Sequence, residues 1–191
     1  MAQRADRRKV AIYDTTLRDG TQAQSVSLSR EDKILIARRL DEFGVDYIEG
    51  GYPLSNPKEE AFFAEMAGIE LKQARLTAFG MTRKKGVAVA EDASIRALVA
   101  SQAPVVAIVG KADEYQVRKV LGASLDENLR MIAESVRYCR DQGREVVFDA
   151  EHFFDGYKRN AESALKIVQA AAEAGATTAC LCDTNGGSLS N

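Results

Sequence analysis

The sequence has no tryptophan, one histidine, three prolines and three cysteines among its 191 residues. Three cysteines cannot form an even disulfide framework, so a small domain held together by disulfides is excluded. No apolar run is long enough to span a bilayer and the first residues contain no apolar signal core, so we expect no membrane partner. We therefore predict a cytoplasmic protein in which Cys180 and Cys182, on an expected buried strand, are reduced core thiols.

A large charge of either sign is also lacking. Lys and Arg total 26 against 28 Asp and Glu, and the formal net charge is −2. Nucleic-acid-binding proteins carry a marked basic excess, so we expect no nucleic-acid partner. Cys180 and Cys182 form a C-x-C pair, a spacing that can bind metal, but no second pair lies nearby and we predict no metal there.

Six short apolar runs alternate with helical patterns along the chain. The runs cover residues 10–13, 47–48, 76–79, 105–109, 146–148 and 178–181. Each run is continuous instead of alternating with polar residues, which is typical of strands buried on both faces. The sequence therefore predicts six buried strands, the first and the last among them.

Helix-capping residues mark five helices between these strands. Ser29, Asn56 and Asn160 are favoured N-caps, and Ser124 with Glu127 has the spacing of a capping box. The expected helices cover residues 29–44, 56–68, 91–102, 124–143 and 160–175, of which 91–102 has the poorest caps. In the first helix, the expected apolar face consists of Leu35, Ile36, Leu40 and Phe43.

The alternation of strands and helices predicts an α/β fold with right-handed crossovers and a parallel sheet. Period alone does not separate an open doubly wound sheet from part of a (βα)8 barrel. An open sheet that binds a dinucleotide has G-x-G-x-x-G after its first strand, and this sequence has no such motif there. The dinucleotide version of the open sheet is therefore disfavoured.

Polar side chains collect where the expected strands end. They are found at residues 14–19, Glu49, Lys111, Asp113, Asp149, Glu151 and residues 183–185. In a (βα)8 barrel these strand ends converge on one mouth, where a cation such as Mg²⁺ or Mn²⁺ could join the acids and an arginine could hold a carboxylate. Each acid could equally be a turn residue, and we expect the sole histidine, His152, to be packed and not a ligand.

Four motifs resemble those of a known family. They are "YDTTLRDGTQAQ", "YIEGGYPLSNPKEEAFF", "DAEHFFDGYKRN" and "LCDTNGG". Together they are similar to the citramalate synthase branch of the isopropylmalate synthase family, in the lyase-like TIM-barrel superfamily. The resemblance begins near residue 10, runs to the last residue, and implies an α/β TIM (βα)8 barrel. Residues 1–191 would be the N-terminal portion of its catalytic domain.

The resemblance also implies roles for individual residues. Asp19 matches a ligand of a divalent metal, Mg²⁺ or Mn²⁺, with Zn²⁺ as an alternative. Arg18 matches an arginine that orients a keto acid and stabilises an enolate. Glu151 matches a glutamate that supports this arginine and takes part in proton transfer. Further substrate contacts are implied at Gln22, Phe79 and Thr184.

The implied reaction is a Claisen condensation of acetyl-CoA with pyruvate, giving (R)-citramalate and CoA for isoleucine biosynthesis. Synthesis of 2-isopropylmalate or homocitrate is the nearest alternative, because pocket residues and not the fold choose the keto acid. Two alternatives come from other classes: a non-catalytic module that binds a keto acid, and an inactive gene product.

One departure from the family pattern concerns the metal. The family's other metal ligands are a His-x-His pair at the end of the seventh strand, whereas His152 lies elsewhere. The sequence stops where that strand would begin, so we expect about six of eight βα units, with strands 7 and 8 missing. We expect this chain alone to bind divalent metal weakly, through Asp19 and water, and to be inactive. Its unpaired first and sixth strands predict self-association, for example as a homodimer.

Overall fold

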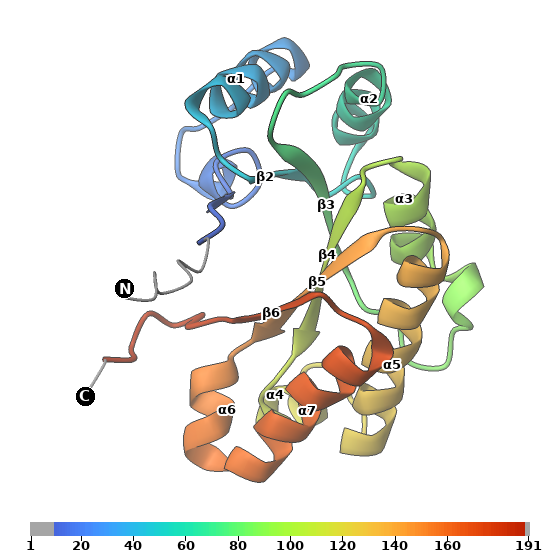
Figure 1. Ribbon diagram of the computed structural model, residues 1–191. Helices are drawn as coiled ribbons and strands as arrows, with labels where there is room; N and C mark the ends of the chain where they lie inside the picture. The colour runs from blue at the N-terminus through green and yellow to red at the C-terminus, as the bar shows by residue number, and fades with distance from the viewer. Residues whose placement is uncertain (1–9, 190–191) are drawn as a thin grey trace, which may run out of the picture.

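The computed structural model describes residues 10–189, in which six parallel strands are joined by helices (Figure 1). The strands are β1 (Tyr13–Asp14), β2 (Tyr47–Gly51), β3 (Arg75–Met81), β4 (Val105–Lys111), β5 (Glu145–Glu151) and β6 (Thr178–Leu181). The helices are α1 (Arg30–Phe43), α2 (Pro57–Met66), α3 (Ala93–Ala100), α4 (Glu114–Lys119), α5 (Leu125–Asp141), α6 (Phe153–Arg159) and α7 (Ala161–Ala174). Each strand pairs with the next in chain order. The predicted partial (βα)8 barrel of about six units is confirmed.

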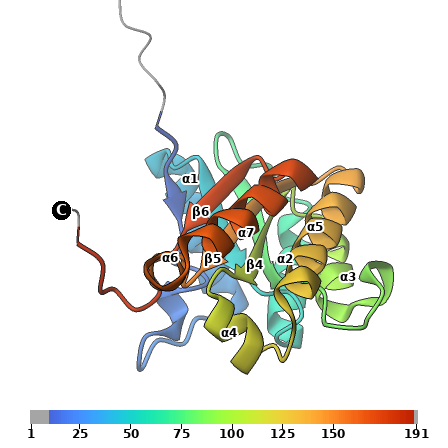
Figure 2. The same cartoon turned by 90° about the horizontal axis from the view of Figure 1, so that it is seen from below.

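The sheet curves, and its helices cover the outer side of the curve (Figure 1). Helix α1 packs on β2, α3 on β3, α5 on β4 and β5, and α7 on β5 and β6. Seen from below, α5 and α7 lie side by side over this outer face (Figure 2). Within residues 10–189, no helix has the length and apolar character needed to cross a membrane.

Strand β4 shows how the alternation of side chains divides the interior. Val106 and Ile108 belong to the large core shared with the helices, whereas Val105 and Ala107 form part of a separate cluster. This second cluster lies on the inner face of the sheet. The aromatic side chains that pack against it are Tyr13, Tyr47 and Phe79.

Helix α1 begins and ends at the predicted residues. The Ser29 hydroxyl accepts a hydrogen bond from the Asp32 N–H at 3.1 Å, and the Asp32 carboxylate accepts one from the Ser29 N–H at 2.9 Å. The two bonds form a capping box. Gly44 ends the helix in the left-handed conformation, with φ of 95°. Local polar chemistry therefore sets both ends of α1.

The predicted apolar face of α1 is correct for Ile36 and Leu40, which pack against the core, and wrong for Leu35 and Phe43. Leu35 and Phe43 are exposed, Phe43 by 86%, and Ile36 and Leu40 are only partly buried. The helix buries instead Lys33, Ile34, Ala37 and Asp41. Two of these are charged and are accommodated because each has partners: Lys33 bonds Glu59, and the Asp41 carboxylate accepts the backbone N–H groups of residues 72–74.

The two edge strands are more exposed than predicted. Val10 and Ile12 lie outside β1, and Val10 is 79% exposed. Every residue of β6 is exposed. Within residues 10–189, β1 pairs only with β2 and β6 only with β5, so one side of each lacks a neighbouring strand. The run 178–181 forms β6, whereas only Tyr13 of the run 10–13 lies in β1. Burial on both faces requires covering neighbours on each side, and within residues 10–189 each of these strands has one.

The prediction that Cys180 and Cys182 are buried core thiols is wrong. Cys139 on α5 is buried, whereas Cys180 is exposed and Cys182 is partly buried. Cys180 and Cys182 are more exposed than Cys139 for the same reason as the rest of the edge strand, because Cys180 belongs to β6 and Cys182 follows it directly. Cys180 and Cys182 are therefore accessible from the inner face of the sheet.

Two short helices, α4 and α6, were not predicted. Asp113 caps α4 by accepting the Tyr115 N–H at 3.0 Å. His152 precedes α6 with φ of 61°, a left-handed conformation that is uncommon for a residue with a side chain. The helix expected at 91–102 is the shorter α3, and it is well capped by Asp92. Two 3-10 turns, η1 (Gly20–Gln22) and η2 (Val89–Glu91), complete the chain's described elements.

A buried ion pair joins α1 to α2. Lys33 Nζ donates to both oxygens of Glu59, at 2.7 and 2.6 Å. The pair lies against Gly51, the last residue of β2, whose φ is 146°. A Cβ at Gly51 would lie 1.8 Å from Glu59 Oε2 and 2.9 Å from Lys33 Nζ. Gly51 is thus required both by its backbone conformation and by the space that the ion pair occupies.

We predict that Gly51→Ala destabilises the protein by more than about 3 kcal/mol, because it displaces a buried ion pair. Gly86→Ala is the matched control, since Gly86 also has a positive φ, 75°, but no atom within 4 Å of an added Cβ. The control should lose only about 1 kcal/mol from backbone strain. Urea denaturation of both variants measures the difference. Equal losses would show that the ion pair tolerates the methyl group.

Candidate active site

The loop after β1 turns sharply at the end of the strand. The Thr15 carbonyl accepts the N–H groups of Arg18 and Gly20, both at 3.1 Å. The Asp14 carboxylate accepts the Thr16 N–H at 3.0 Å, and the Leu17 side chain is fully buried. Leu17 thereby anchors the loop, while Arg18 is directed to the inner side of the sheet, toward β2.

A buried carboxylate holds Arg18. Glu49, on β2, is 1% exposed; its Oε1 accepts the Arg18 Nε–H and its Oε2 accepts the Tyr13 hydroxyl. Burial alone would lower the pKa of Arg18, but the Glu49 carboxylate more than offsets this and the pKa is raised. Burial and the same carboxylate raise the pKa of Tyr13. Arg18 is therefore a fixed cation and Tyr13 a fixed neutral donor.

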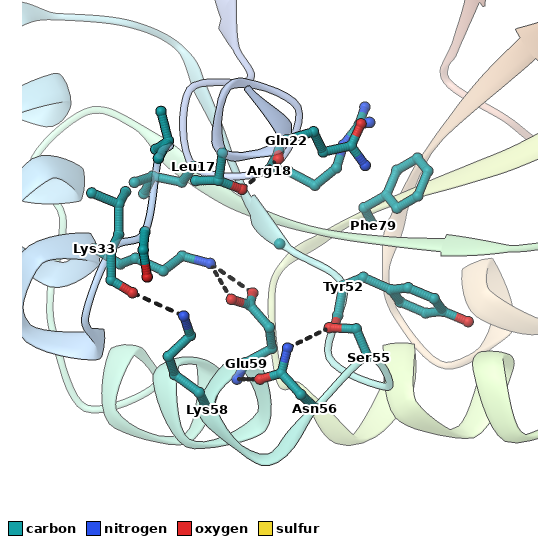
Figure 3. A pocket seen from close by; sticks show the side chains of 15 residues that line it. Leu17, Arg18, Gln22, Lys33, Tyr52, Ser55, Asn56, Lys58, Glu59 and Phe79 are labelled. Atoms are coloured by element: carbon teal, nitrogen blue, oxygen red, sulfur yellow. Dashed lines mark hydrogen bonds and ion pairs between the residues drawn. The ribbon is translucent and has the colours of Figure 1, made fainter. Parts of the chain in front are cut away.

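Arg18 borders a cavity of about 300 Å³ at the ends of β1 to β3. Its guanidinium carbon lies 4.1 Å from the centroid of the Phe79 ring, a cation–π contact. Gln22 also borders the cavity, with Arg18 and Phe79 on one side and the Lys33–Glu59 pair on the other (Figure 3). The structure thus brings together three of the residues predicted to bind substrate: Arg18, Gln22 and Phe79.

Asp19 lies beside Arg18 but belongs to no cluster of acids. Its side chain is 62% exposed, and Oδ1 accepts an N–H from Arg18 Nη1 at 3.1 Å. Residues 10–189 contain one group of three or more Asp, Glu, Cys or His side chains that are close enough to share a metal ion. Asp19 is not in that group. A single open carboxylate fits a cation that retains most of its water ligands, as Mg²⁺ does.

Glu151 does not support Arg18. Its carboxylate, at the end of β5, accepts a hydrogen bond from Lys111 Nζ at the end of β4. Lys111 and Glu151 are register partners in the sheet, which explains the pairing. The buried carboxylate that bonds Arg18 is that of Glu49, because β2 is the strand next to β1. This part of the expected role of Glu151 is corrected, whereas its role in proton transfer stays a prediction.

Thr184 lies after β6 and away from the cavity beside Arg18. Its Oγ1 accepts the backbone N–H of His152 at 2.9 Å. The His152 side chain is largely buried, with Nδ1 3.8 Å from Asp155, and Asp155 also accepts a hydrogen bond from Asn185. The expectation that His152 packs is consistent with this burial. These contacts fix the ends of β5 and β6 relative to each other.

Several acids at the strand ends are cap or turn residues. The Asp183 carboxylate accepts the N–H groups of Gly187 and Ser188, at 3.3 and 2.8 Å. Asp113 caps α4 and pairs with Arg159. Asp14 caps the loop before Arg18. Asp14 and Asp183 thus bond the backbone of their own turns, whereas Asp113 combines a local cap with an ion pair to α6.

Asp149 and the two exposed cysteines form a second polar group on the inner face. Burial, followed by the charges of Glu49 and Cys180, raises the pKa of Asp149 to about 7. A hydrogen bond from the Cys182 thiol lowers the pKa of Cys180 to about 7 and raises that of Cys182. The Sγ atoms of the two cysteines are 4.0 Å apart.

Sequence reasoning found Glu49 and Asp149 at strand ends but gave neither a role. A signal was present for Glu49, because an acid inside an apolar, glycine-rich strand end needs a buried cation. Arg18 is the arginine nearest in sequence to the end of the preceding strand, which makes it the natural partner. For Asp149, no sequence pattern indicated whether its side chain would lie on the inner face of the sheet or in the turn that follows the strand.

A family model described as HMGL-like matches residues 9–190, so the chain belongs to the HMGL-like family. The chain is 52% identical over 181 residues to the (R)-citramalate synthase of Aquifex aeolicus (strain VF5), covering 95% of this chain and 34% of that protein. It is 51% identical over 182 residues to the (R)-citramalate synthase of Sulfolobus acidocaldarius, covering 95% and 35%. The resemblance to the citramalate branch is confirmed. The chain spans about a third of the length of these curated relatives.

Relatives named 2-isopropylmalate or homocitrate synthase match less closely, at 36% and 33% identity. Among solved structures, the HMG-CoA lyase of Bacillus subtilis superposes with a TM-score of 0.74 at 21% identity. The match covers 94% of this chain and 60% of that one. At this identity the similarity shows the fold alone, and that fold agrees with the partial barrel.

The raised pKa of Asp149 predicts a pH-dependent loss of stability. Between about pH 4 and about pH 7 the folded protein keeps a proton on Asp149 that the unfolded chain releases, so stability falls as the pH rises. From about pH 5 to about pH 8, Asp149→Asn should gain about 1–4 kcal/mol in unfolding free energy relative to the unmodified chain. Denaturant titrations with a metal chelator present measure this difference.

Asp183→Asn is the control for this prediction. Backbone hydrogen bonds lower the pKa of Asp183 below its usual value, so its titration lies below the tested window. The effect of Asp183→Asn on the unfolding free energy should therefore be the same at about pH 5 and at about pH 8. A pH-independent effect of Asp149→Asn would show that Asp149 is ionised in the folded protein.

Proposed function

We propose that this chain is part of an (R)-citramalate synthase, an acyltransferase that condenses acetyl-CoA with pyruvate. The observation that carries the proposal is the Arg18 guanidinium, held by the buried Glu49 carboxylate at the edge of a cavity. Identities of 52% and 51% to relatives of that name support this choice within the family. Residues 1–191 would form the N-terminal portion of the catalytic barrel domain.

The free donors of Arg18 suit a 2-keto acid. A guanidinium has five N–H donors, and within residues 10–189 one is bonded to Glu49 and one to Asp19, which leaves three. A planar fork of N–H groups beside the Phe79 ring can bind the carboxylate of pyruvate through two hydrogen bonds. The remaining donor can stabilise the negative charge that develops on the attacked carbonyl oxygen.

Carbon–carbon bond formation requires a base. We assign this role to the Glu151 carboxylate, which would accept a proton from the methyl group of acetyl-CoA. The resulting enolate carbon attacks C2 of pyruvate, the C2 oxygen takes up a proton, and water then cleaves the thioester to release CoA. Gln22 and Phe79 line the cavity, and the Thr184 hydroxyl, at the end of β6, is the proposed third substrate contact.

Asp19 is the residue proposed to hold a divalent cation, Mg²⁺ or Mn²⁺, with Zn²⁺ as an alternative. Its exposed carboxylate beside Arg18 is open to solvent and to a bound keto acid. Cations of this kind need only one or two carboxylates when water and substrate complete the set. A bound cation would supply Lewis-acid polarisation of the keto group.

Two alternatives remain as outcomes of the test. Synthesis of 2-isopropylmalate or homocitrate would use the same arginine with a different pocket wall, and the lower identity to those relatives disfavours it. A non-catalytic module would bind a keto acid at Arg18 without turnover and without metal dependence. The chain taken alone is proposed to be inactive. Production of (R)-citramalate would serve isoleucine biosynthesis, and a cytoplasmic location suits three cysteines that are all free.

The test uses the full-length protein with acetyl-CoA and each of pyruvate, 2-oxoisovalerate and 2-oxoglutarate. We expect the highest kcat/KM with pyruvate, and we expect Arg18→Ala to lower it by at least about 10²-fold, because an oriented charge is lost from the transition state. Release of CoA, followed with a thiol reagent, measures turnover. Absence of turnover with pyruvate would refute the proposal.

Two further variants separate catalysis from folding. Arg18→Lys keeps a cation beside Glu49 but removes the planar fork, so it should retain the melting temperature and still lose most activity. Arg39→Ala removes an exposed pair with Glu42 on α1 and should change neither. Near-normal activity of Arg18→Lys would mean that Arg18 serves only to neutralise Glu49.

We also propose that the 191-residue chain associates with itself. Among residues 10–189, no strand pairs with the outer edges of β1 and β6, and the exposed apolar side chains of Ile12 and Leu181 lie beside those edges. Light scattering after size exclusion should show a dimer or larger species that Leu181→Lys shifts toward the monomer. The control is Leu165→Lys, which introduces the same charge at another exposed leucine, on α7 and away from the sheet edges. A concentration-independent monomer would contradict the proposal.

A further inference from the structure

Three metal-binding side chains converge on the inner face of β5 and β6. Asp149 and Cys180 are register partners on adjacent strands, and Cys182 lies two residues further along, on the same face as Cys180. One carboxylate oxygen and the two Sγ atoms all lie within 4.8 Å of one another. Within residues 10–189, this is the cluster of at least three such residues that could hold a metal ion.

The spacing of the sulfur atoms fits a tetrahedral metal. Two thiolates on one Zn²⁺, each at about 2.3 Å, are about 3.8 Å apart. The Cys180 and Cys182 Sγ atoms are 4.0 Å apart, so they need to move by only a few tenths of an ångström. The carboxylate oxygen lies within 4.8 Å of both sulfur atoms, so it needs to approach by at most about 1 Å to form a Zn–O bond of about 2.1 Å, which rotation of the Asp149 side chain can supply.

The three groups are available for a ligand. All three cysteines of the chain are free, and Cys180 is exposed while Cys182 is partly exposed. The Cys182 thiol donates only to the Cys180 carbonyl, at 3.7 Å, and to the Cys180 sulfur. No Lys, Arg or His in the described part of the chain forms an ion pair with Asp149, although it lies near the Glu49 carboxylate. The positive charge of Arg18 acts on Asp149 without forming an ion pair with it, so a cation bound among the three groups would add the direct positive partner that they lack within residues 10–189.

We propose that Asp149, Cys180 and Cys182 bind a thiophilic divalent cation, of which Zn²⁺ is the biological candidate. Water or another small ligand would occupy the fourth position, because β6 is open on this side. Two sulfur ligands select Zn²⁺, Co²⁺ or Cd²⁺ over Mg²⁺ and Mn²⁺, which prefer oxygen. The site is separate from the single carboxylate of Asp19 and goes beyond the proposed condensation.

The test is titration of the 191-residue chain with Co²⁺. The chain is first freed of metal with a chelator, reduced with a phosphine and kept without oxygen, so that no disulfide forms between Cys180 and Cys182. We expect sulfur-to-cobalt charge-transfer absorption that saturates at one Co²⁺ per chain. Zn²⁺ should abolish the absorption, whereas excess Mg²⁺ should leave it unchanged.

Single substitutions identify the ligands. Cys180→Ser and Cys182→Ser should each lower the affinity for Co²⁺ by more than about 100-fold, beyond the usual effect of losing an outer hydrogen-bond partner. Asp149→Asn should weaken binding by at least about 10-fold but retain the absorption, since both sulfurs remain. Cys139→Ala, at the buried cysteine outside the cluster, and Asp19→Ala should both leave the absorption unchanged.

A second readout needs no substitution. In the unmodified chain, Zn²⁺ should protect Cys180 and Cys182 from alkylation by iodoacetamide, as mapped by mass spectrometry. Far-ultraviolet circular dichroism confirms that each variant is folded before its titration is read. Absence of charge-transfer absorption, its persistence in folded Cys180→Ser or Cys182→Ser, or unprotected thiols with Zn²⁺ bound would overturn the proposal.

Discussion

The buried carboxylate of Glu49 is the constraint on which the arrangement of the mouth depends. A charged group that is 1% exposed must be paired, and its two oxygens are bonded to Arg18 and Tyr13. Both partners come from β1 or the loop that follows it. Because β1 has only two residues, Glu49 adds to the buried Leu17 side chain in holding the loop in one position. Loss of one partner of such a pair costs about 3–5 kcal/mol.

The parts of the fold that could be predicted are those determined by local chemistry. Ser29, Asn56 and Asn160 cap helices because their side chains bond backbone groups two or three residues away, which a sequence reveals directly. The burial of α1 could not be predicted in this way. Lys33 and Asp41 are buried because Glu59 on α2 and the backbone before β3 receive them, and these partners lie 26 or more residues away.

The candidate site shows the same division. The strand-end pattern pointed to Arg18 and the family resemblance to Gln22 and Phe79, and all three line one cavity. The strand-end pattern could not decide whether Glu49 or Glu151 would meet Arg18, because both end parallel strands. Spatial order decides: Glu49 is on the strand next to β1, whereas Glu151 is four strands along the sheet and is paired with Lys111. A residue's role at a barrel mouth thus depends on which strands are neighbours in the sheet. The periodicity of the sequence gives no information about that order.

The inner face also limits how many anions it can hold. Both oxygens of Glu49 are bonded, to Arg18 and Tyr13. Asp149 lies near the same carboxylate, has no ion-pair partner of its own among residues 10–189, and has a pKa raised to about 7. An additional negative charge can enter this region only with a cation or at a free donor. Arg18 retains three such donors on the side of β1, and a thiophilic cation would meet the need on the side of β6. The two ends of the sheet therefore solve the same electrostatic problem with different chemistry, a guanidinium fork at one end and a pair of thiols at the other.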